Sequence, residues 1–537
     1  MKKTKLILFS ILAGILLSVG WPARGFPFIL FFGFVPLLFI EDYIRKNYNA
    51  FNKFSLLFYS FPAFLTWNIL TTWWIYYATV FGMVGAIVLN ALFMSIIFHL
   101  FHTTSRIIGE KTGFLSFIFY WIAFEYFHLD WDLSWPWLTL GNGFANHPEW
   151  IQWYEYTGVF GGTLWILLLN LFIFFVLKGF ASGKKLTEQI PFTIAGILIL
   201  LVVPLTYSIY VYHHYEDKGF PVNVVVVQPN IDPYNEKFDP DTFSGQMDKL
   251  ISLAKSQIDS TTQLLVYPET AISENVWEND LDKQTSIFRI RKLSSENPKL
   301  NIIIGISSLR TCDPSEKKSP TVRKFTDSDN YFEAYNAALL LNFPDKFQLY
   351  HKSKLVPGVE EVPFPKLFKP LESLAINLGG TTGSLGTQEN RTPFTTSINH
   401  LKVAPVICYE SIYGEFLSKY VANGAQLITI ITNDGWWSDT PGYKQHFQYA
   451  RLRAIETRRC VARSANTGIS GFINQKGDVL QTTGWWQPAA IKQTVLANNA
   501  ITFYTKYGDF IGRLSMYLST LIILFSVFKR VVLNKKG

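Results

Sequence analysis

Three short segments of the chain each place a chemically capable side chain at or just past the end of a predicted strand. The side chains are those of Glu269, Lys352 and Cys408. A thiolate is the nucleophilic form of cysteine, and a thiol with a pKa of about 8.5 needs help to reach that form. A carboxylate can take the proton as a general base, and an ammonium group can stabilise the thiolate and a developing oxyanion. Together the three residues predict nucleophilic catalysis, with Cys408 as the nucleophile.

Each of these residues has an ordinary interpretation when it is taken alone. A cysteine after an apolar strand is usually a small buried hydrophobe, Glu269 could cap the helix that follows it, and Lys352 could be a surface charge. The combination favours the catalytic interpretation, because strand ends are where α/β folds usually present catalytic groups.

The elements that must position these side chains lie between residues 215 and 505, where the composition is mixed and polar. Short β-branched runs recur there, with helical patterns between several of them. The runs are 222–228, 264–267, 301–304, 337–341, 403–407, 427–431 and 461–464, and the helical patterns include 240–257 and 444–459. Strands that alternate with helices predict a layered α/β domain. Residues 313–330 are rich in Ser, Lys, Asp and Pro, and we expect them to form a surface insertion.

The rest of the chain is strongly apolar. Hydrophobic residues make up 49% of the sequence and charged residues only 16%, below the roughly 25% that is typical of soluble domains. Most of the apolar runs are long enough to cross a hydrocarbon core as helices, which takes about 20 residues. We expect about eight membrane-spanning helices, near residues 6–21, 26–40, 55–77, 83–102, 113–129, 160–178, 191–212 and 510–528.

The distribution of charge between the loops predicts the orientation. Lys and Arg gather at both termini and in alternate loops, whereas the short loops on the other side hold only Arg24. The positive-inside rule therefore places both termini in the cytoplasm and residues 215–505 on the outer face, which is the periplasm in a bacterium. The segment Ser18–Pro22 lacks a good small-residue cleavage site, so we expect the first helix to be retained.

This organisation predicts three parts. Residues 1–214 form an N-terminal transmembrane domain of about seven helices, residues 215–505 form the catalytic domain, and residues 506–537 form a C-terminal transmembrane helix with a cytoplasmic tail.

The loop at 127–159 is rich in tryptophan and has no Lys or Arg. It could form an aromatic belt at the membrane interface, where Trp rings commonly settle, or a re-entrant arm that guides lipid beside the catalytic domain. Few ionisable residues lie in the expected spans, and Glu125 is the clearest exception. Because such residues usually mark transport pathways, their scarcity argues against a transporter.

The sequence has no pattern typical of a metal, nucleotide or nucleic-acid site. An anionic membrane surface explains the net charge of +8 better than nucleic acid does, since no nucleic-acid-binding motif accompanies that charge. The three cysteines, Cys312, Cys408 and Cys460, do not make a disulfide framework. We interpret His351 and His446 as structural, and we expect no cofactor.

Glu269, Lys352 and Cys408, in this order and context, match the catalytic set of the nitrilase superfamily, the carbon–nitrogen hydrolases, which the chain resembles. A nitrilase-like domain between a seventh and an eighth membrane span is the architecture of the apolipoprotein N-acyltransferase family, and the resemblance to that family covers nearly the whole chain. It implies an αββα sandwich for the catalytic domain. Other stretches that resemble this family are 227–230, 433–437, 446–448, 450–451, 453–456 and 463–468.

The resemblance implies a two-step acyl transfer. Cys408 would take a fatty acyl group from the sn-1 position of a phospholipid, giving a thioester and a lysophospholipid. The α-amino group of the N-terminal diacylglyceryl-cysteine of an apolipoprotein would then attack the thioester, in a ping-pong sequence within the inner membrane. Glu269 would be the general base in both steps, and Lys352 would support the oxyanion.

The resemblance also implies supporting residues. Glu360 matches a second family glutamate near the site, although many members carry Phe-Gly-Glu where this chain has Gly-Val-Glu, and Glu361 follows directly. Tyr409 and Glu410 follow the nucleophile as in that family. Glu410 could equally be a structural hydrogen-bond anchor.

Three aromatic residues could contact the lipid chain. Phe238 stands where we would expect a tryptophan, and it keeps an aromatic face but loses the indole donor. Trp436 and Trp437 could form a lid over the lipid, or they could belong to a packed hydrophobic corner.

Two rival functions stay open at the level of sequence. A membrane-anchored amidase would use the same three residues and would clear its thioester with water, so dependence on a phospholipid donor separates it from a transferase. The second rival is a non-enzymatic membrane scaffold or transporter with a degenerate domain, and the intact Glu269, Lys352 and Cys408 argue against it.

Overall fold

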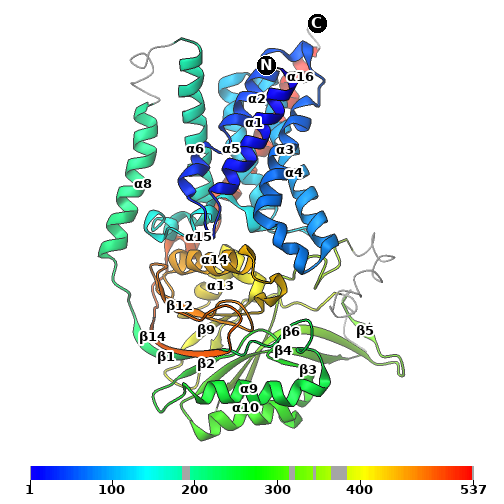
Figure 1. Cartoon of the computed structure of the whole chain (residues 1–537), viewed down its shortest axis with the longest axis vertical. Coiled ribbons are helices and arrows are strands. Elements are labelled where there is room, and N and C mark those ends of the chain that lie inside the picture. The colour runs from blue at the N-terminus through cyan, green and yellow to red at the C-terminus, as the bar shows by residue number, and fades with distance from the viewer. Residues whose placement is uncertain (1, 184–193, 314–320, 343–345, 365–383, 535–537) are drawn as a thin grey trace. The chain divides into compact units, whose positions relative to one another are not determined.

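The structure is a computed structural model that describes residues 2–183, 194–313, 321–342, 346–364 and 384–534. The chain divides into two compact units, one made of residues 1–214 and 507–537 and the other of residues 215–506 (Figure 1). Some residues used above lie outside the described ranges. They are residues 314–320 of the expected insertion, residues 191–193 of the expected span 191–212, and the basic residues Lys184, Lys185, Lys535 and Lys536.

The first unit is helical, and each expected span overlaps a helix, although the span at 26–40 begins with a 3-10 helix, η1 (Pro27–Phe32). The helices are α1 (Lys3–Val19), α2 (Val35–Lys46), α3 (Ser55–Thr72), α4 (Val80–Ile108), α5 (Glu110–Phe127), α6 (Tyr154–Ala181), α8 (Ala195–His214) and α16 (Phe510–Asn534). Within the described residues, five stretches are long and apolar enough to cross a membrane, and a shorter apolar helix covers residues 112–127. The five are 27–46, 80–108, 154–181, 195–214 and 510–532. Of the other expected spans, α1 has only 17 residues and α3 carries Ser, Thr and Asn.

The tryptophan-rich loop between α5 and α6 packs against its own unit through short 3-10 turns. Trp137 is buried, and its ring centroid lies 4.8 Å from that of Trp74. The carboxylate of Glu125, near the end of α5, accepts hydrogen bonds from the main-chain N–H of Leu140 at 2.9 Å and from the hydroxyl of Thr163 at 2.7 Å. Glu125 therefore ties the loop to α5 and α6, which gives this buried carboxylate a structural role.

The second unit contains two β-sheets between two layers of helices (Figure 1). The first sheet has the order β14-β1-β2-β4-β6-β5, with β3 paired to β4 and β7 paired to β6, and the second has the order β13-β12-β11-β10-β9-β8. Helices α9 (Phe243–Lys255) and α10 (Thr285–Glu296) pack on the first sheet, and α13 (Gly414–Ala422) and α14 (Pro441–Thr457) pack on the second.

The bounds of the strands are as follows. The first sheet contains β1 (Phe220–Gln228), β2 (Leu264–Val266), β3 (Ile272–Trp277), β4 (Asn301–Cys312), β5 (Arg323–Lys324), β6 (Tyr331–Asn342), β7 (Lys346–His351) and β14 (Ala489–Ala497). The second contains β8 (Phe394–Thr395), β9 (Lys402–Ile407), β10 (Leu427–Thr432), β11 (Val461–Ala465), β12 (Gly471–Ile473) and β13 (Val479–Thr482).

Strand β1 shows why the sequence of this unit is locally so apolar. Val224 and Val226 belong to the core between the two sheets, whereas Val225 and Val227 belong to the core beneath α9 and α10. Side chains alternate between the two faces of a strand, so a strand that is buried on both faces is a continuous apolar run. The first sheet is therefore covered on both sides, as an αββα sandwich requires.

The pairing of the strands sets where the site residues emerge. Strand β9 is parallel to β10, and β10 is parallel to β11, so their carboxyl ends lie at one edge of the second sheet. Cys408 follows β9 at this edge. In the first sheet, Glu269 comes shortly after the end of β2, and Lys352 comes directly after β7.

Every strand expected from the sequence falls within or at an observed strand, and the helical patterns at 240–257 and 444–459 correspond to α9 and α14. Strand β14 was not expected. It pairs with β1 at the edge of the first sheet. Because much of β14 is only half-buried, it accommodates the polar residues Lys492, Gln493 and Thr494, which hide the strand in the sequence. A helical apolar region followed by a layered α/β domain confirms the predicted fold class.

Ile430 lies within β10 and is fully buried. We expect Ile430→Ala to lower the free energy of unfolding of the second unit by about 2–5 kcal/mol, because the truncated side chain leaves a cavity. The measurement is the temperature at which the buried thiol of Cys460 begins to react with a maleimide, followed by mass spectrometry. Leu480→Ala truncates an exposed side chain in β13 and is the control, with an expected change below about 0.5 kcal/mol. If Cys460 begins to react at the same temperature in both variants, the core position of Ile430 is contradicted.

Candidate active site

Cys408 stands at the turn between β9 and the 3-10 helix η12 (Cys408–Ile412). Its φ of 50° lies in the left-handed region, where non-glycine residues cost roughly 1–3 kcal/mol and where functional residues cluster. The residue is only 8% exposed. A strained turn therefore holds the thiol in a nearly dry environment.

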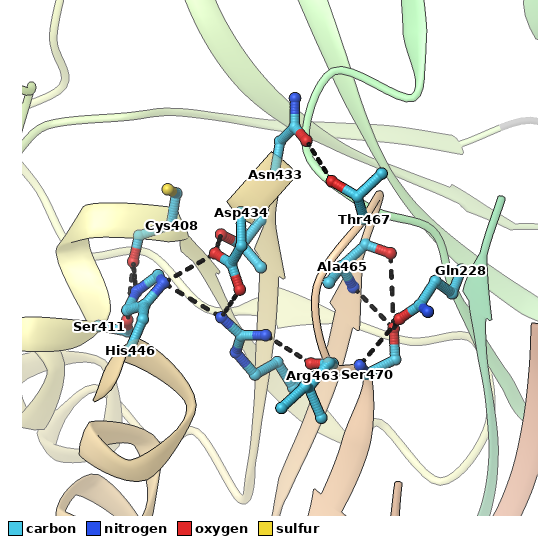
Figure 2. A network of polar contacts seen from close by, with 12 residues as sticks. Gln228, Cys408, Ser411, Asn433, Asp434, His446, Arg463, Ala465, Thr467 and Ser470 are labelled. Carbon is cyan, nitrogen blue, oxygen red and sulfur yellow. Dashed lines mark hydrogen bonds and ion pairs between the residues drawn. The ribbon is translucent and has the colours of Figure 1, made fainter. Parts of the chain in front are cut away.

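A buried polar network lies behind this turn (Figure 2). Through Nε2, His446 contacts the main-chain oxygen of Cys408 at 3.2 Å and Oγ of Ser411 at 2.9 Å. Its Nδ1 lies 2.9 Å from Oδ1 of Asp434, whose Oδ2 accepts a hydrogen bond from Arg463 at 2.7 Å. Figure 2 shows the Cys408 side chain pointing away from His446. The network thus supports the main chain of Cys408 and leaves its sulfur to other groups.

Lys352 lies between two carboxylates. Its Nζ donates to Oε1 of Glu269 at 3.0 Å and to Oε1 of Glu360 at 2.9 Å. The side-chain amide of Asn336 donates to the same two oxygens, at 2.7 and 3.0 Å. The structure therefore brings Glu269, Lys352 and Glu360 into one buried cluster, and Asn336 bridges its two carboxylates.

A glycine in the adjacent strand makes room for Glu269. A Cβ added to Gly305 of β4 would lie 2.6 Å from Cα of Glu269 and 2.5 Å from the main-chain nitrogen of Thr270. Thr270 itself has a φ of 45°. The turn that carries Glu269 is therefore strained and closely packed, which fixes the position of the carboxylate.

The charges of this cluster set the protonation of the resting site. Burial raises the pKa of Glu269, but Lys352 and Asn336 outweigh burial, and the net pKa lies below its ordinary value. Burial lowers the pKa of Lys352, but the two carboxylates hold the net pKa well above its ordinary value. Burial raises the pKa of the Cys408 thiol, and the negative charge of Glu269 raises it further. The resting site therefore holds a carboxylate, an ammonium group and a neutral thiol.

Glu410 is a second buried carboxylate near Cys408, with a different environment. Its Oε1 accepts from the hydroxyl of Tyr350 and from the main-chain N–H of Ser353, both at 2.7 Å, and its Oε2 accepts from the N–H of Ile407 at 2.8 Å. Ile407 precedes the nucleophile, and Ser353 follows Lys352. This geometry favours the anchoring interpretation, because one carboxylate joins the nucleophile turn to the lysine loop.

The remaining predicted site residues are aromatic, and they separate into two environments. The rings of Phe238 and Trp436 are stacked with centroids 6.4 Å apart, and Phe238 is 47% exposed. The ring of Trp437 instead packs edge-on against His446 at 5.5 Å. Tyr409 is buried and packs edge-on against Tyr413. Only Phe238 and Trp436 thus form a joint aromatic face.

Two residues of this site were not predicted from the sequence. Lys237 is 1% exposed, and its Nζ donates to the main-chain oxygen of Glu269 at 3.0 Å. Asn336 bridges Glu269 and Glu360 from β6. A signal existed for Asn336, since it is the one amide within the otherwise apolar run from Ala334 to Leu341. Lys237 lies in a loop, and of this loop only the neighbouring residue Phe238 was predicted to belong to the site.

Within the described residues, no group of three or more His, Cys, Asp or Glu side chains is placed to hold a metal ion. Asp434 and His446 are adjacent, but the guanidinium of Arg463 occupies the other side of the carboxylate.

Comparison with known proteins places the chain among the carbon–nitrogen hydrolases. That family matches residues 223–498, which is more than half of the chain, and the chain therefore belongs to it. A second family, the apolipoprotein N-acyltransferase N-terminal domain, matches residues 13–172. The resemblance predicted from the sequence is confirmed.

Proteins named apolipoprotein N-acyltransferase are similar over almost the full length. That of Chlorobaculum tepidum is 28% identical, with 98% of this chain and 97% of the relative covered. That of Geobacter metallireducens is 28% identical over 94% and 91%. Among solved structures, an amidase from Nesterenkonia sp. has a TM-score of 0.35 and 16% identity, covering 52% of this chain and 93% of its own. Saccharomyces cerevisiae Nit3 has a TM-score of 0.36 and 15% identity, covering 55% and 95%.

We expect Lys352→Met to destabilise the second unit by about 3–5 kcal/mol near neutral pH, because it leaves two buried carboxylates without their cation. In the wild type, the lowered pKa of Glu269 means that its contribution to stability is present above its ordinary pKa of 4.5 and is lost as the pH falls through its folded pKa. In the variant, burial favours the protonated carboxyl. The difference in stability should therefore shrink as the pH falls.

The measurement is the thermal midpoint of both proteins from neutral to acidic pH, followed by intrinsic fluorescence in detergent. Lys283→Met is the control, because the ion pair of Lys283 with Asp280 is exposed, and surface ion pairs contribute little to stability. A difference between wild type and Lys352→Met that stays constant with pH would contradict the charge assignment.

Proposed function

We propose that this chain is an apolipoprotein N-acyltransferase, which moves a fatty acyl chain from a phospholipid through a Cys408 thioester to the α-amino group of an N-terminal diacylglyceryl-cysteine. The observation that carries the proposal is the combination of two features in one chain. A buried cysteine, carboxylate and lysine cluster lies in a carbon–nitrogen hydrolase domain, and the membrane region matches the apolipoprotein N-acyltransferase N-terminal domain. The names of the relatives imply lipoprotein and lipid substrates.

The first half-reaction forms the thioester. The proton of the Cys408 thiol moves to the carboxylate of Glu269, and the thiolate attacks the ester carbonyl carbon of a phospholipid. The carbonyl oxygen becomes an oxyanion in the tetrahedral intermediate. Collapse of this intermediate breaks the ester C–O bond, and the leaving lysophospholipid oxygen takes the proton from Glu269. Cys408 is left acylated, and Glu269 is again a carboxylate.

Lys352 is suited to support the oxyanion. An ammonium group has three N–H donors, and two of those of Lys352 are used by Glu269 and Glu360. The third has no partner among the described residues and is available to the oxyanion. A charged donor in a dry site stabilises developing negative charge more strongly than the same donor in water.

The second half-reaction transfers the acyl chain. The α-amino group of the acceptor attacks the thioester carbonyl carbon, and Glu269 takes the proton that the amine loses. Collapse of the tetrahedral intermediate breaks the C–S bond. The Cys408 thiolate that leaves recovers its proton from Glu269, and the product is an amide. In each half-reaction, Glu269 thus acts first as the base and then as the acid.

Other residues act through these groups. Glu360 and Asn336 hold Lys352 and Glu269 in place, and Glu410 joins the two loops that carry the nucleophile and the lysine. The stacked rings of Phe238 and Trp436 offer an exposed aromatic face to an acyl chain. Trp437 packs on His446 and has a structural environment.

The relatives and the apolar helices indicate a membrane protein. We further propose that it is a multi-pass protein of the bacterial inner membrane with both termini in the cytoplasm. Residues 215–505 then form a periplasmic catalytic domain between the N-terminal transmembrane domain, 1–214, and the C-terminal helix, 506–537. The excess of Lys and Arg in alternate loops supports this orientation.

Incubation of the purified protein with a phospholipid should add an acyl-sized mass to the peptide that contains Cys408. Hydroxylamine should remove this mass, and a diacylated lipopeptide should remove it while becoming N-acylated. Cys408→Ala should abolish the adduct, whereas Cys460→Ala, which truncates another buried cysteine of the same domain, should retain it. A thioester that only water clears would point to an amidase, and a folded protein that forms no adduct would point to a non-catalytic scaffold.

The orientation is tested by labelling engineered cysteines in spheroplasts with a membrane-impermeant maleimide. Lys283→Cys lies in the second unit and Lys46→Cys at the end of α2, and both positions are exposed. We expect labelling of the first variant in intact spheroplasts and of the second only after permeabilisation. The opposite pattern would overturn the proposed orientation without affecting the proposed chemistry.

A further inference from the structure

The loop between β1 and α9 turns two consecutive side chains in opposite directions. Lys237 is 1% exposed, and its neighbour Phe238 is 47% exposed. The main-chain N–H of Lys237 donates to the main-chain oxygen of Asp232 at 2.9 Å, and the side-chain amide of Gln246 donates to the main-chain oxygens of Glu236 and Lys237. These hydrogen bonds fix the loop, so the inward position of Lys237 is built into the fold.

The buried amine of Lys237 has fewer partners than its chemistry demands. Its Nζ donates to the main-chain oxygen of Glu269 at 3.0 Å, and this is its only hydrogen bond among the described residues. An ammonium group has three donors, and a buried charge is normally paired or fully hydrogen-bonded. Lys352, by contrast, has a carboxylate on each of two donors. Among the described residues, Lys237 thus makes no hydrogen bond to a carboxylate in the resting state, although the charge of Glu269 acts on it from nearby.

The charged groups around Lys237 indicate which neighbouring group could become its anionic partner during the reaction. The pKa of Lys237 is lowered to about 8, because burial lowers it more than the negative charges of Glu269 and of an ionised Cys408 raise it. Around Cys408 itself, Glu269 and Asp434 disfavour the thiolate, and Lys352 favours it. Glu269 already has Lys352 as its partner. The thiolate of Cys408 is therefore the anion that would complete the environment of Lys237.

Formation of the Cys408 thiolate in the resting site needs such an additional positive charge. The ordinary pKa values of the thiol and the carboxyl are 9.0 and 4.5, and the environment raises the first and lowers the second. Transfer of the proton from Cys408 to Glu269 is therefore unfavourable before any substrate is bound, because the thiol is a weaker acid and the carboxylate a weaker base than usual. The pair of Glu269 with Lys352 cannot remove this cost, because that pairing is what makes the carboxylate a weak base.

We propose that Lys237 is a second cationic positioning residue, which holds the main chain of Glu269 and stabilises the Cys408 thiolate and the anionic intermediate derived from it. The inference deepens the proposed function, since it assumes that Cys408 is the nucleophile. Formation of the thiolate and protonation of Lys237 favour each other, because each raises the stability of the other charge. Loss of the lysine charge should therefore raise the apparent pKa of the Cys408 thiol.

A purely structural role makes a different prediction. If Lys237 only holds the carbonyl of Glu269, its replacement changes the fold or the rate without moving the ionisation of the thiol. The ionisation of Cys408 can be followed without any lipid, by the rate at which iodoacetamide alkylates it as the pH is raised. Mass spectrometry of the Cys408 peptide gives this rate, and the Cys312 peptide in the same sample reports any general change in reagent or protein.

The variants separate charge from shape. Lys237→Met removes the charge and keeps a side chain of similar length, and relief of the desolvation cost should preserve the fold. Lys237→Arg keeps a charge and a donor. Lys249→Met is the matched control, because Lys249 also donates to a main-chain oxygen, that of Asn230, but does so from α9. Thermal midpoints confirm that each variant is folded, and Lys237→Gln takes the place of Lys237→Met if the latter is unfolded.

We expect the alkylation profile of Cys408 in Lys237→Met to move to higher pH by about one unit, which is about a tenfold loss of rate near neutral pH. Lys237→Arg and Lys249→Met should stay within about threefold of the wild type, a change of about half a pKa unit or less, and Cys312 should not change in any variant. An unchanged profile in Lys237→Met would overturn the proposal, and so would an equal shift in Lys237→Met and Lys237→Arg, which would assign the effect to shape.

This test also separates the inference from the proposed function. A shifted alkylation profile in a protein that forms no acyl adduct with phospholipid would support Lys237 as a positioning residue and reject the acyltransferase. A normal profile together with normal acyl transfer in Lys237→Met would keep the acyltransferase and reject the role of Lys237.

Discussion

The second unit depends on one buried contact, that between the carboxylate of Glu269 and the ammonium group of Lys352. Burial of either charge alone would cost several kcal/mol, so the fold must bring both to the same point. They follow β2 and β7, which are separated in the sheet by β4 and β6. Each intervening strand contributes to the contact. Gly305 of β4 allows the Glu269 turn to approach, and Asn336 of β6 bridges the carboxylates of Glu269 and Glu360.

The two buried carboxylates near the nucleophile show how partners decide what a glutamate can do. Among the described residues, Glu410 accepts hydrogen bonds from a hydroxyl and two main-chain N–H groups, and burial raises its pKa above the ordinary value despite the charge of Arg391. Glu269 has a lysine partner, and its pKa is lowered. The first suits a residue that joins main-chain segments, and the second keeps a charge ready at the site. The same lysine that makes Glu269 stable as a carboxylate also makes it a weaker base, which is why a further cation near the thiol matters.

Much of this arrangement could be predicted from the sequence because its signals are local. Strands that are buried on both faces, such as β1, are continuous apolar runs, and Glu269 and Cys408 follow such strands directly or within a few residues. Lys352 instead follows β7, which is mostly half-buried and has polar residues. Edge strand β14 was missed because much of it is only half-buried and its polar residues interrupt the pattern.

The residues that escaped prediction are defined by contacts across the fold. Lys237 faces Glu269 only because the loop after β1 is fixed by Asp232 and Gln246. Nothing in its local sequence distinguishes it from a surface lysine. His446 was interpreted as structural from its residue type, but its position behind Cys408 depends on Asp434 and Arg463, which come from other elements of the second sheet and its edge.

The arrangement of charge also bears on which acceptor the acyl-enzyme takes. An α-amino group has a pKa of about 7.7–8.0 and attacks only in its neutral form. Lys352 and a protonated Lys237 are two cations beside Cys408, and like charges disfavour protonation of a third amine close to them. In the proposed mechanism, these cations therefore favour the neutral, nucleophilic form of an acceptor amine, and the carboxylate of Glu269 takes the proton that the amine loses on attack. In this way the cations that stabilise the thiolate in the first step prepare the amine for the second.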